Sequence, residues 1–363
     1  MKSWIFIGYV VLCLFSCGSN SDDRGMLPPS QDEVDGLSKQ QQEAETLMKQ
    51  LWMYTPLQRL PLQPERITAL DKLQELADRC SATYFSDYLS CIDTKAESIE
   101  KYDILLSCYR LAIDKVIQEI KEDKVENGTA HIWMLYNMGY IVKTPSGCFG
   151  IDLMHRWAKK LAPFLDFLCI THNHQDHYNN ALITAMLESG KPVLSNYIKK
   201  GKEYTSTVPA NYTIKNFTIR TSITDHNNSG LSNFVTVFSI DCGADSNHFT
   251  LMHTGDSNYK PAQFTNILGT VDLLIPRYAP NALTENNIIG NQEGQTQPAY
   301  VLLSHILELT HASEEESRWS ISSALERASK INCNQTYVPM WGEKMIWKNN
   351  KLNLSLIHIS EPT

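Results

Sequence analysis

One short stretch, residues 171–178, constrains this chain more than any other. It reads Thr-His-Asn-His-Gln-Asp-His-Tyr and holds four metal-binding side chains within six residues: His172, His174, Asp176 and His177. The apolar run 165–170 before it is typical of a buried strand, and the pattern of 179–187 after it is typical of the start of a helix. The four side chains are therefore predicted to lie in the loop between a strand and a helix.

The chemistry of these side chains predicts a metal site. Neutral imidazoles and carboxylates are ligands that zinc and similar divalent metals favour. Residues two apart in extended backbone point the same way, so His172 and His174 can bind one cation while Asp176 and His177 face a neighbouring position. Burying four polar groups together is costly unless a partner satisfies them. A cluster of structural histidines without a metal is therefore the less favoured interpretation.

The pattern His-x-His-x-Asp-His resembles the signature of the metallo-β-lactamase superfamily. Further candidate ligands follow strand-like runs in the order of that family: His226 after 212–223, Asp256 after 249–252, and His305 at the end of an apolar run. The resemblance covers residues 127–345. It implies a first metal held by His172, His174 and His226, a second held by Asp176, His177 and His305, and Asp256 as the bridge between them.

The resemblance also implies the fold and an outer partner of the metal site. Alternating strands and helices by themselves indicate an α/β protein. The family adds an αββα sandwich, that is, two mixed β-sheets flanked by helices, here preceded by a helical N-terminal region. In the family an aspartate at the position of Asp152 bonds a ligand histidine and fixes its orientation. The alternative role for Asp152 is the N-cap of a helix over 154–161.

The chain begins with a segment that is typical of export. Lys2 precedes an apolar run that is too short to span a bilayer, and the run ends in Leu-Phe-Ser-Cys-Gly, which resembles a bacterial lipobox. We expect residues 1–17 to be a lipoprotein signal peptide, Cys17 to be acylated, and 18–41 to be a flexible tether. The predicted location is a membrane anchor on the periplasmic side or the cell surface. An ordinary signal peptide and an uncleaved anchor are the alternatives.

Residues 42–125 are predicted to form three to five helices with a packing or lid role, because apolar residues recur there at helical spacing. The metallo-β-lactamase-like domain is predicted over 126–345. The last stretch, 354–363, fits no expected element and is predicted to be a non-native tail. Seven cysteines lie beyond Cys17, and a disulfide among Cys80, Cys91 and Cys108 is one option that the sequence leaves open.

The formal net charge of −8 disfavours nucleic acid as a partner, since phosphate backbones call for basic surfaces. A small-molecule or lipid substrate and a membrane reached through the N-terminal lipid are the expected partners. Arg277 and Tyr278 follow a predicted strand and could contact an anionic substrate, with plain surface placement as the alternative. The sequence does not determine the oligomeric state.

The ligand set predicts a hydrolase. Two divalent metals, with zinc expected and manganese or iron as alternatives, can activate a shared water. Asp176 and Asp256 are then catalytic as well as metal-binding. The resemblance points to ester, lactone or phosphodiester cleavage, as in the ascorbate-phosphate lactonase and N-acyl-phosphatidylethanolamine phospholipase branch. The alternatives are a lipid-anchored binding or scaffold protein with a vestigial metal site, and a β-lactamase, although antibiotic-cleaving members generally lack the bridging aspartate.

Overall fold

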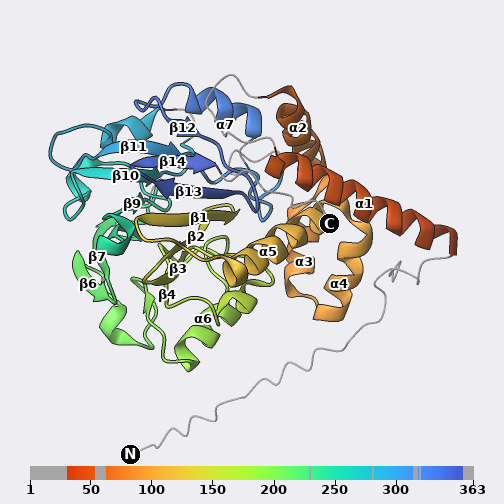
Figure 1. The fold of residues 1–363 in the computed structure, drawn as a ribbon, viewed down its shortest axis with the longest axis horizontal. Helices are drawn as coiled ribbons and strands as arrows, with labels where there is room; N and C mark the ends of the chain where they lie inside the picture. The colour runs from red at the N-terminus through yellow and green to blue at the C-terminus, as the bar shows by residue number, and fades with distance from the viewer. Residues whose placement is uncertain are drawn as a thin grey trace, which may run out of the picture.

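The computed structural model describes residues 31–53, 63–228, 230–279, 282–313, 318 and 320–354. The predicted signal peptide with Cys17 lies outside these residues, as does the predicted tail apart from Leu354. Within them, two seven-stranded sheets pack face to face and helices lie on the outside (Figure 1). No helix in these ranges is both long enough and apolar enough to cross a membrane.

The first sheet has the strand order β14-β13-β1-β2-β3-β4-β5. Its strands are β1 (Thr129–Tyr136), β2 (Gly139–Thr144), β3 (Gly147–Ile151), β4 (Phe167–Cys169), β5 (Val193–Leu194), β13 (Lys344–Lys348) and β14 (Lys351–Leu354). Strands β1, β2 and β3 form an antiparallel meander, whereas β3, β4 and β5 run parallel. The sheet is therefore mixed.

The second sheet has the order β12-β11-β10-β9-β8-β7-β6. Its strands are β6 (Ala210–Ile214), β7 (Phe217–Thr224), β8 (Val235–Asp241), β9 (Thr250–His253), β10 (Thr270–Ile275), β11 (Gln297–Leu302) and β12 (Thr336–Tyr337). Strands β6 to β9 pair antiparallel and β9 to β12 pair parallel. This sheet is also mixed, and β8 and β9 form a hairpin within it.

Two features of the sheets differ from the sequence prediction. The single strand-like run 212–223 is a hairpin of β6 and β7, and it reverses at Lys215, whose φ is 50°. No glycine or proline marks that turn. The first sheet also continues past residue 345, because β13 pairs with β1 and then turns through Asn349 and Asn350, both at positive φ, into β14. Positive φ at both positions of a two-residue turn matches the twist of the strands it joins.

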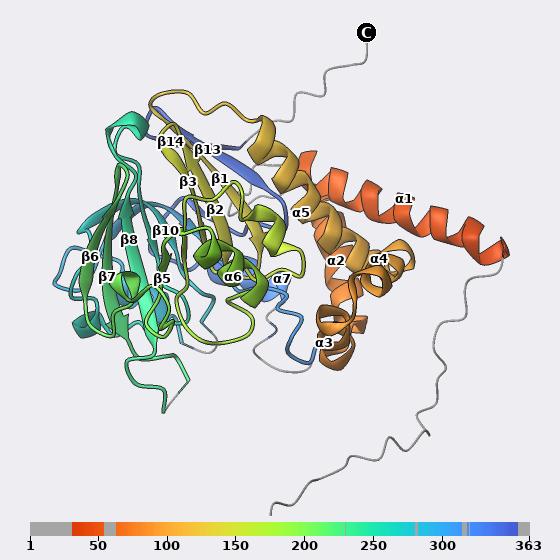
Figure 2. The ribbon, with the colours of Figure 1, turned by 90° about the horizontal axis from the view of Figure 1, so that it is seen from below.

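The helices complete the predicted sandwich. Helix α5 (Ile104–Glu122) packs on β1, α6 (Asn180–Glu188) packs on β4 and β5, and α7 (Ile321–Ala328) contacts β12. Figure 2 shows the second sheet on one side, the first sheet in the middle, and α5 and the other N-terminal helices on the far side of the first sheet. The prediction of two mixed sheets flanked by helices is therefore confirmed.

The N-terminal helical region contains five described helices. They are α1 (Gln31–Met53), α2 (Pro64–Arg79), α3 (Ala82–Ser90), α4 (Asp93–Tyr102) and α5. Helix α1 begins inside the segment 18–41 that the sequence predicts as a tether. Side chains cap two of the others: the Ser81 hydroxyl accepts from Tyr84 N at the start of α3, and the Asp103 carboxylate accepts from Leu106 N at the start of α5.

The helical region and the sheets share one hydrophobic core. Buried residues of the helices, such as Leu70 and Tyr109, belong to the same packed cluster as Trp133 and Trp341 of the sandwich. Cys80, Cys91 and Cys108 are free thiols, so the disulfide considered among them is absent from the structure. Apolar packing and polar contacts hold the helices in place without that covalent link.

A buried ion pair joins α2 to the segment between β12 and β13. The Arg66 guanidinium and the Glu343 carboxylate bond directly, and both side chains are almost fully buried. Arg66 Nη1 also donates to Leu51 O over 3.0 Å, and Glu343 Oε2 accepts from Met340 N over 2.8 Å. Each charge is thus paired and hydrogen-bonded, which burial requires.

We expect Arg66→Met to lower the free energy of unfolding by about 3–5 kcal/mol, because it leaves the Glu343 carboxylate buried and unpaired. The double variant with Glu343→Leu should recover most of that loss. Lys49→Met is the control, since Lys49 and Glu45 form an exposed pair whose loss costs under about 1 kcal/mol. Urea unfolding measures all three, and an Arg66→Met protein as stable as the control contradicts the expectation.

Candidate metal centre

The site lies where strands of both sheets end. The candidate ligands follow the carboxyl ends of four strands: residues 172–177 follow β4, His226 follows β7, Asp256 follows β9, and His305 follows β11. Strands β9, β10 and β11 run parallel, so their carboxyl ends meet at one edge of the sheet. The alternating direction of β7, β8 and β9 brings the end of β7 to the same edge.

The structure brings together all seven residues that the resemblance implies as ligands. In each of three groups, one ligand atom per residue lies within 4.8 Å of the others: His172 with His174 and His226; Asp176 with His177 and His305; and His172 with His177 and Asp256. Six of the seven are buried, and His174 is half-buried. Two ligand triads and a residue between them are thus present in one pocket.

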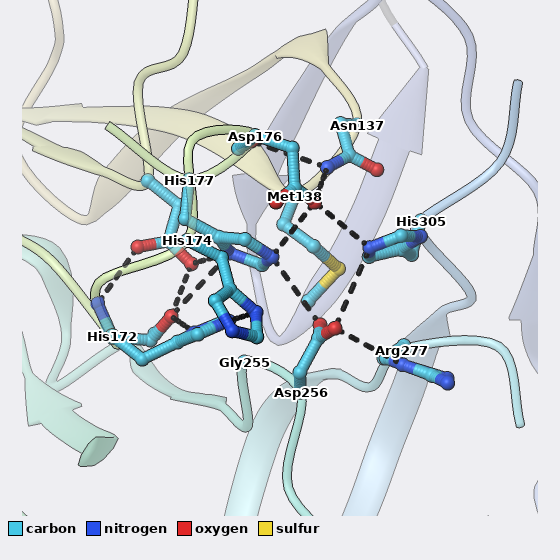
Figure 3. Close-up of polar contacts among 12 residues, drawn as sticks. Asn137, Met138, His172, His174, Asp176, His177, Gly255, Asp256, Arg277 and His305 are labelled. Carbon is cyan, nitrogen blue, oxygen red and sulfur yellow. Dashed lines mark hydrogen bonds and ion pairs between the residues drawn. The ribbon is translucent and has the colours of Figure 1, made fainter. Parts of the chain in front are cut away.

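Asp256 lies between the two triads. Its Oδ2 is 3.5 Å from Nε2 of His226 and 3.5 Å from Nε2 of His305, and its Oδ1 is 3.4 Å from Nε2 of His177. Figure 3 shows this carboxylate facing His177 and His305. A carboxylate in this place can offer one oxygen to each of two cations, which is the position of a bridge.

Asp176 completes the second triad. Its Oδ2 lies 3.1 Å from Nε2 of His177 and 3.1 Å from Nε2 of His305. Asn137, in the turn between β1 and β2, donates from Nδ2 to the same oxygen over 3.0 Å, and Asn137 O accepts from His305 N over 3.2 Å. Asn137 therefore fixes Asp176 and His305 together, as Figure 3 shows for the side chains.

The donor atoms fit a divalent cation better than they fit one another. His177 Nε2, His226 Nε2 and Asp256 Oδ1 are buried and within 3.5 Å of a charged partner, yet they form no hydrogen bond. Buried polar atoms in native proteins are nearly always satisfied. His172 bonds His174, and His305 bonds Asp176, each over 3.1 Å, so the remaining donors converge with no hydrogen bond of their own. Such a set of imidazole nitrogens and carboxylate oxygens has the chemistry of a metal centre.

The pKa values reveal the local charge. Burial lowers the pKa of His172 well below its ordinary value, so this imidazole is neutral and able to bind a metal. Burial would raise the pKa of Asp176 and of Asp256, but neighbouring imidazoles, and Arg277 beside Asp256, hold both pKa values well below the usual range. Both carboxylates are therefore ionised, and their negative charge favours a cation between the two triads.

The pKa of His177 shifts in the opposite direction to that of His172, because three carboxylates surround its ring. Burial would lower its pKa, but the carboxylates of Asp176, Asp256 and Asp152 raise the pKa of His177 well above its ordinary value. A proton on Nε2 of this ring occupies the place where a cation would bind. Metal binding is therefore expected to release a proton.

Asp152 has the role that the resemblance implies. Its Oδ2 bonds Nδ1 of His177 over 2.8 Å, and it also accepts from Thr171 Oγ1 and, through Oδ1, from Thr171 N. This contact leaves Nε2 of His177 directed at the centre. Asp152 has φ 47° and caps no α-helix, because 154–161 contains only a 3-10 turn at Ala158–Leu161. The N-cap alternative is wrong.

Arg277 and Tyr278 are buried, so the surface alternative is wrong for both. Arg277 Nε lies 3.3 Å from Asp256 Oδ2, and its Nη1 donates to Tyr278 O over 2.8 Å. In Figure 3 the guanidinium lies beside Asp256, which explains its part in lowering the pKa of that carboxyl. Arg277 thus pairs with a candidate ligand, a role that the sequence did not suggest for it.

Gly255 allows the Asp256 loop to approach the 171–178 loop. Its φ is 50°, and a Cβ at this position would lie 2.6 Å from Cβ of Thr171. Thr171 bonds Asp152, so a side chain on Gly255 would displace a residue that holds the site. His253 is also close but points away from the ligands, since its Nε2 contacts Met138 O over 2.9 Å.

Comparison with known proteins gives distant likenesses. No protein-family model and no curated protein matches the sequence. A metallo hydrolase from Ignicoccus hospitalis has 14% identity over 61% of this chain and 99% of its own, with a TM-score of 0.42. The metallo-β-lactamase fold protein YhfI from Bacillus subtilis has 16% identity over 60% and 98%, with a TM-score of 0.41.

Another solved structure, CmlA, a diiron β-hydroxylase from Streptomyces venezuelae, has 10% identity over 62% of this chain and 54% of its own, with a TM-score of 0.42. At these values the fold assignment rests on this chain's own sheet order and its seven converging donors. Those features show that the chain has the metallo-β-lactamase fold, as the sequence resemblance predicted. The particular branch of that superfamily stays a prediction.

We expect Asp152→Asn to weaken zinc binding by about 10–100-fold, the usual effect of removing a partner that orients a ligand histidine. The amide has a single accepting oxygen, so it cannot bond both Thr171 and His177 as the carboxylate does, and His177 loses its fixed tautomer. A chelator competition titration measures the affinity. Asp166→Asn is the control, because that carboxylate bonds Cys148 N and Lys215 away from the ligands. Equal affinities in the two variants contradict the role of Asp152.

Proposed function

We propose that this protein is a metal-dependent hydrolase with a dinuclear centre, acting on an ester, a lactone or a phosphodiester. One observation carries the proposal: seven imidazole and carboxylate side chains from four strand ends converge in a buried pocket, and several of their donor atoms form no hydrogen bond. All seven donors are retained. A catalytic centre requires every one of them, whereas a vestigial site would not need to keep them all.

His172, His174 and His226 would hold one divalent cation and Asp176, His177 and His305 the other, with Asp256 contacting both. Bound there, two such cations supply Lewis acidity and lower the pKa of water. Zinc suits the histidine-rich set best, and manganese and iron are accepted by the same donors.

The chain's own residues supply orientation. The Asp176 carboxylate, fixed by the amide of Asn137, can accept a hydrogen bond from the attacking water and direct its lone pair at the substrate. Asp152 keeps Nε2 of His177 facing the centre. Arg277 holds Asp256 by charge, so the bridging position does not depend on substrate. The Phe234 ring packs beside His172 and His174 and provides an apolar wall.

The choice among substrates follows from Asp256 and from the resemblance. Antibiotic-cleaving members of the family generally lack a bridging aspartate, so Asp256 disfavours that activity. The predicted export out of the cytosol favours a small-molecule or lipid ester as the substrate. Purified protein should therefore contain two metal ions per chain and turn over bis-p-nitrophenyl phosphate or a lactone faster than a cephalosporin. Bound metal without turnover of any of these supports the binding-protein alternative, and fast cephalosporin turnover supports the β-lactamase.

We expect His172→Ala and Asp256→Ala each to reduce turnover more than about a hundredfold, because loss of a ligand exceeds the 10–100-fold cost of losing an outer partner. Thermal unfolding of the helical region should change little. His248→Ala is the control: this histidine is exposed on the turn between β8 and β9 and bonds Asp241. Full activity in either ligand variant contradicts the assignment.

We also propose that the protein is an exported lipoprotein, anchored through Cys17 on the periplasmic side or the cell surface. The support is the sequence of residues 1–17 alone: a positive start, a short apolar run and a lipobox-like end. An anchor of this kind would place the centre near a membrane, where a lipid or lipid-derived ester is accessible.

Cys17→Ser should abolish incorporation of labelled palmitate and move the protein out of the membrane fraction, because acylation needs the thiol. Cys13→Ser, in the same apolar segment, is the matched control and should remain lipidated. Expression in a bacterium with lipoprotein-processing enzymes, followed by fractionation, provides the measurement. Equal labelling of the two variants would refute Cys17 as the acylated residue.

A further inference from the structure

The segment that carries His305 has an unfavourable backbone. His305 has φ 66° and Leu307 has φ 55°, and neither is a glycine. Side chains disfavour this left-handed region, so such residues keep it only where their surroundings hold them. The position of one ligand of the second triad therefore depends on what fixes residues 303–313.

Part of this support comes from the buried carboxylate of Glu308. It accepts from Thr310 N over 2.7 Å, from Thr310 Oγ1 over 2.6 Å and from His311 N over 3.1 Å. The Tyr136 hydroxyl donates to Glu308 over 3.3 Å and accepts from Leu309 N over 2.6 Å. These bonds fold residues 308–311 around one carboxylate, next to the end of β1.

The second support is Arg318, which is 2% exposed. Its guanidinium donates to three carbonyls of the His305 segment: Glu308 O over 3.1 Å, Leu309 O over 3.0 Å, and His311 O. It also donates to Ala77 O and Cys80 O, each over 2.7 Å, at the carboxyl end of α2. Carbonyls at that end of a helix carry partial negative charge and lack partners within the helix. The Arg318 guanidinium thus joins the end of α2 to the His305 segment.

Helix α2 and Tyr136 are themselves held by the helical region and its contacts. Gln74 of α2 accepts from Ile321 N, at the start of α7, over 2.8 Å. The Tyr136 ring packs edge-on against Tyr109 of α5, with centroids 5.2 Å apart, and near Phe85 of α3. Arg318 and Tyr136, which both bond the His305 segment, are therefore in contact with helices α2, α3 and α5.

We propose that the helical region of residues 63–122 is an integral part of the metal centre, with Arg318 as the positioning residue that fixes His305. The inference rests on the dinuclear centre proposed above and adds a role to a region whose sequence suggests only packing or a lid. Arg318 touches neither substrate nor ligand atoms. It acts by joining the carboxyl end of α2 to the carbonyls of the segment that presents His305.

This proposal predicts a selective loss at one subsite. His305 of the second triad comes from this segment and bonds Asp176 over 3.1 Å, whereas all three residues of the first triad follow β4 and β7. A role in packing alone would lower stability without changing the ratio of metal to protein. A positioning role changes that ratio while the fold persists.

The test compares Arg318→Lys with Arg66→Lys in the full chain. Lysine keeps the charge but cannot reach five carbonyls in two segments. Arg66→Lys is the matched control, because Arg66 is also a buried arginine at the α2 interface but bonds Leu51 and Glu343 rather than the His305 segment. Zinc per chain and the dissociation constant of the weaker-bound zinc are measured, together with thermal unfolding and the absorption of cobalt-substituted protein.

For Arg318→Lys we expect the dissociation constant of the weaker zinc to rise about 10–100-fold, with the tighter zinc unchanged. About half of the cobalt absorption should be lost at a free cobalt concentration that just fills both wild-type subsites. Arg66→Lys should bind two zinc ions with wild-type affinity whatever its stability. Unchanged affinity in Arg318→Lys, or equal losses in both variants, overturns the inference while leaving the hydrolase proposal intact. A wild-type chain that binds no zinc refutes both.

Tyr136→Phe decides the question if Arg318→Lys does not fold. It removes only the hydroxyl between Leu309 and Glu308 and keeps the ring packed against Tyr109. Weaker binding of the second zinc, in the same direction as for Arg318→Lys but smaller, supports the proposal. A folded Tyr136→Phe protein with wild-type affinity at both subsites overturns it.

Discussion

The structure depends on the concentration of negative charge at one edge of its two sheets. Asp152, Asp176 and Asp256 are all buried there, among imidazoles whose pKa values shift in opposite directions according to their neighbours. Buried carboxylates are tolerated only when paired with positive charge and hydrogen-bonded. The cluster therefore needs positive charge beside its carboxylates, which a divalent cation would supply.

The sandwich satisfies this need by distributing the donors over strand ends. Each strand is rigid and fixed in register by its neighbours, so the four donors that lie two or three positions beyond a strand are placed accurately. The other three donors lie further along the loop after β4. The exceptions are His305 and Asp152, whose own φ values are unfavourable. At these two points the structure adds further bonds, from the helical region to the His305 segment and from Thr171 to Asp152.

The helical region illustrates how an added segment becomes part of a site. Its apolar faces join the core of the sandwich, and its many polar contacts with the sandwich include two buried arginines: Arg66 with Glu343, and Arg318 with the end of α2. Charges in such positions favour one docking geometry, because other arrangements leave them unpaired. The contacts of Arg318 also fix the segment that carries His305.

The sequence by itself determined the local features. The His-x-His-x-Asp-His motif, the helical spacing of the N-terminal region, and the strands that became β1 to β4 and β8 to β10 are set by short-range patterns of polarity, and the family resemblance supplied His226, Asp256 and His305. The division of 212–223 into β6 and β7 was missed because Lys215 turns the chain without glycine or proline. Strand β13 was missed because its pairing with β1 crosses more than two hundred residues, and with it β14, which pairs with β13. The roles of Asn137, Arg277 and Arg318 were decided only by the tertiary structure. An asparagine in a turn or an arginine in a loop can bond water or many different side chains. Only the packed structure, which buries the side chain away from water, decides which of these partners it has.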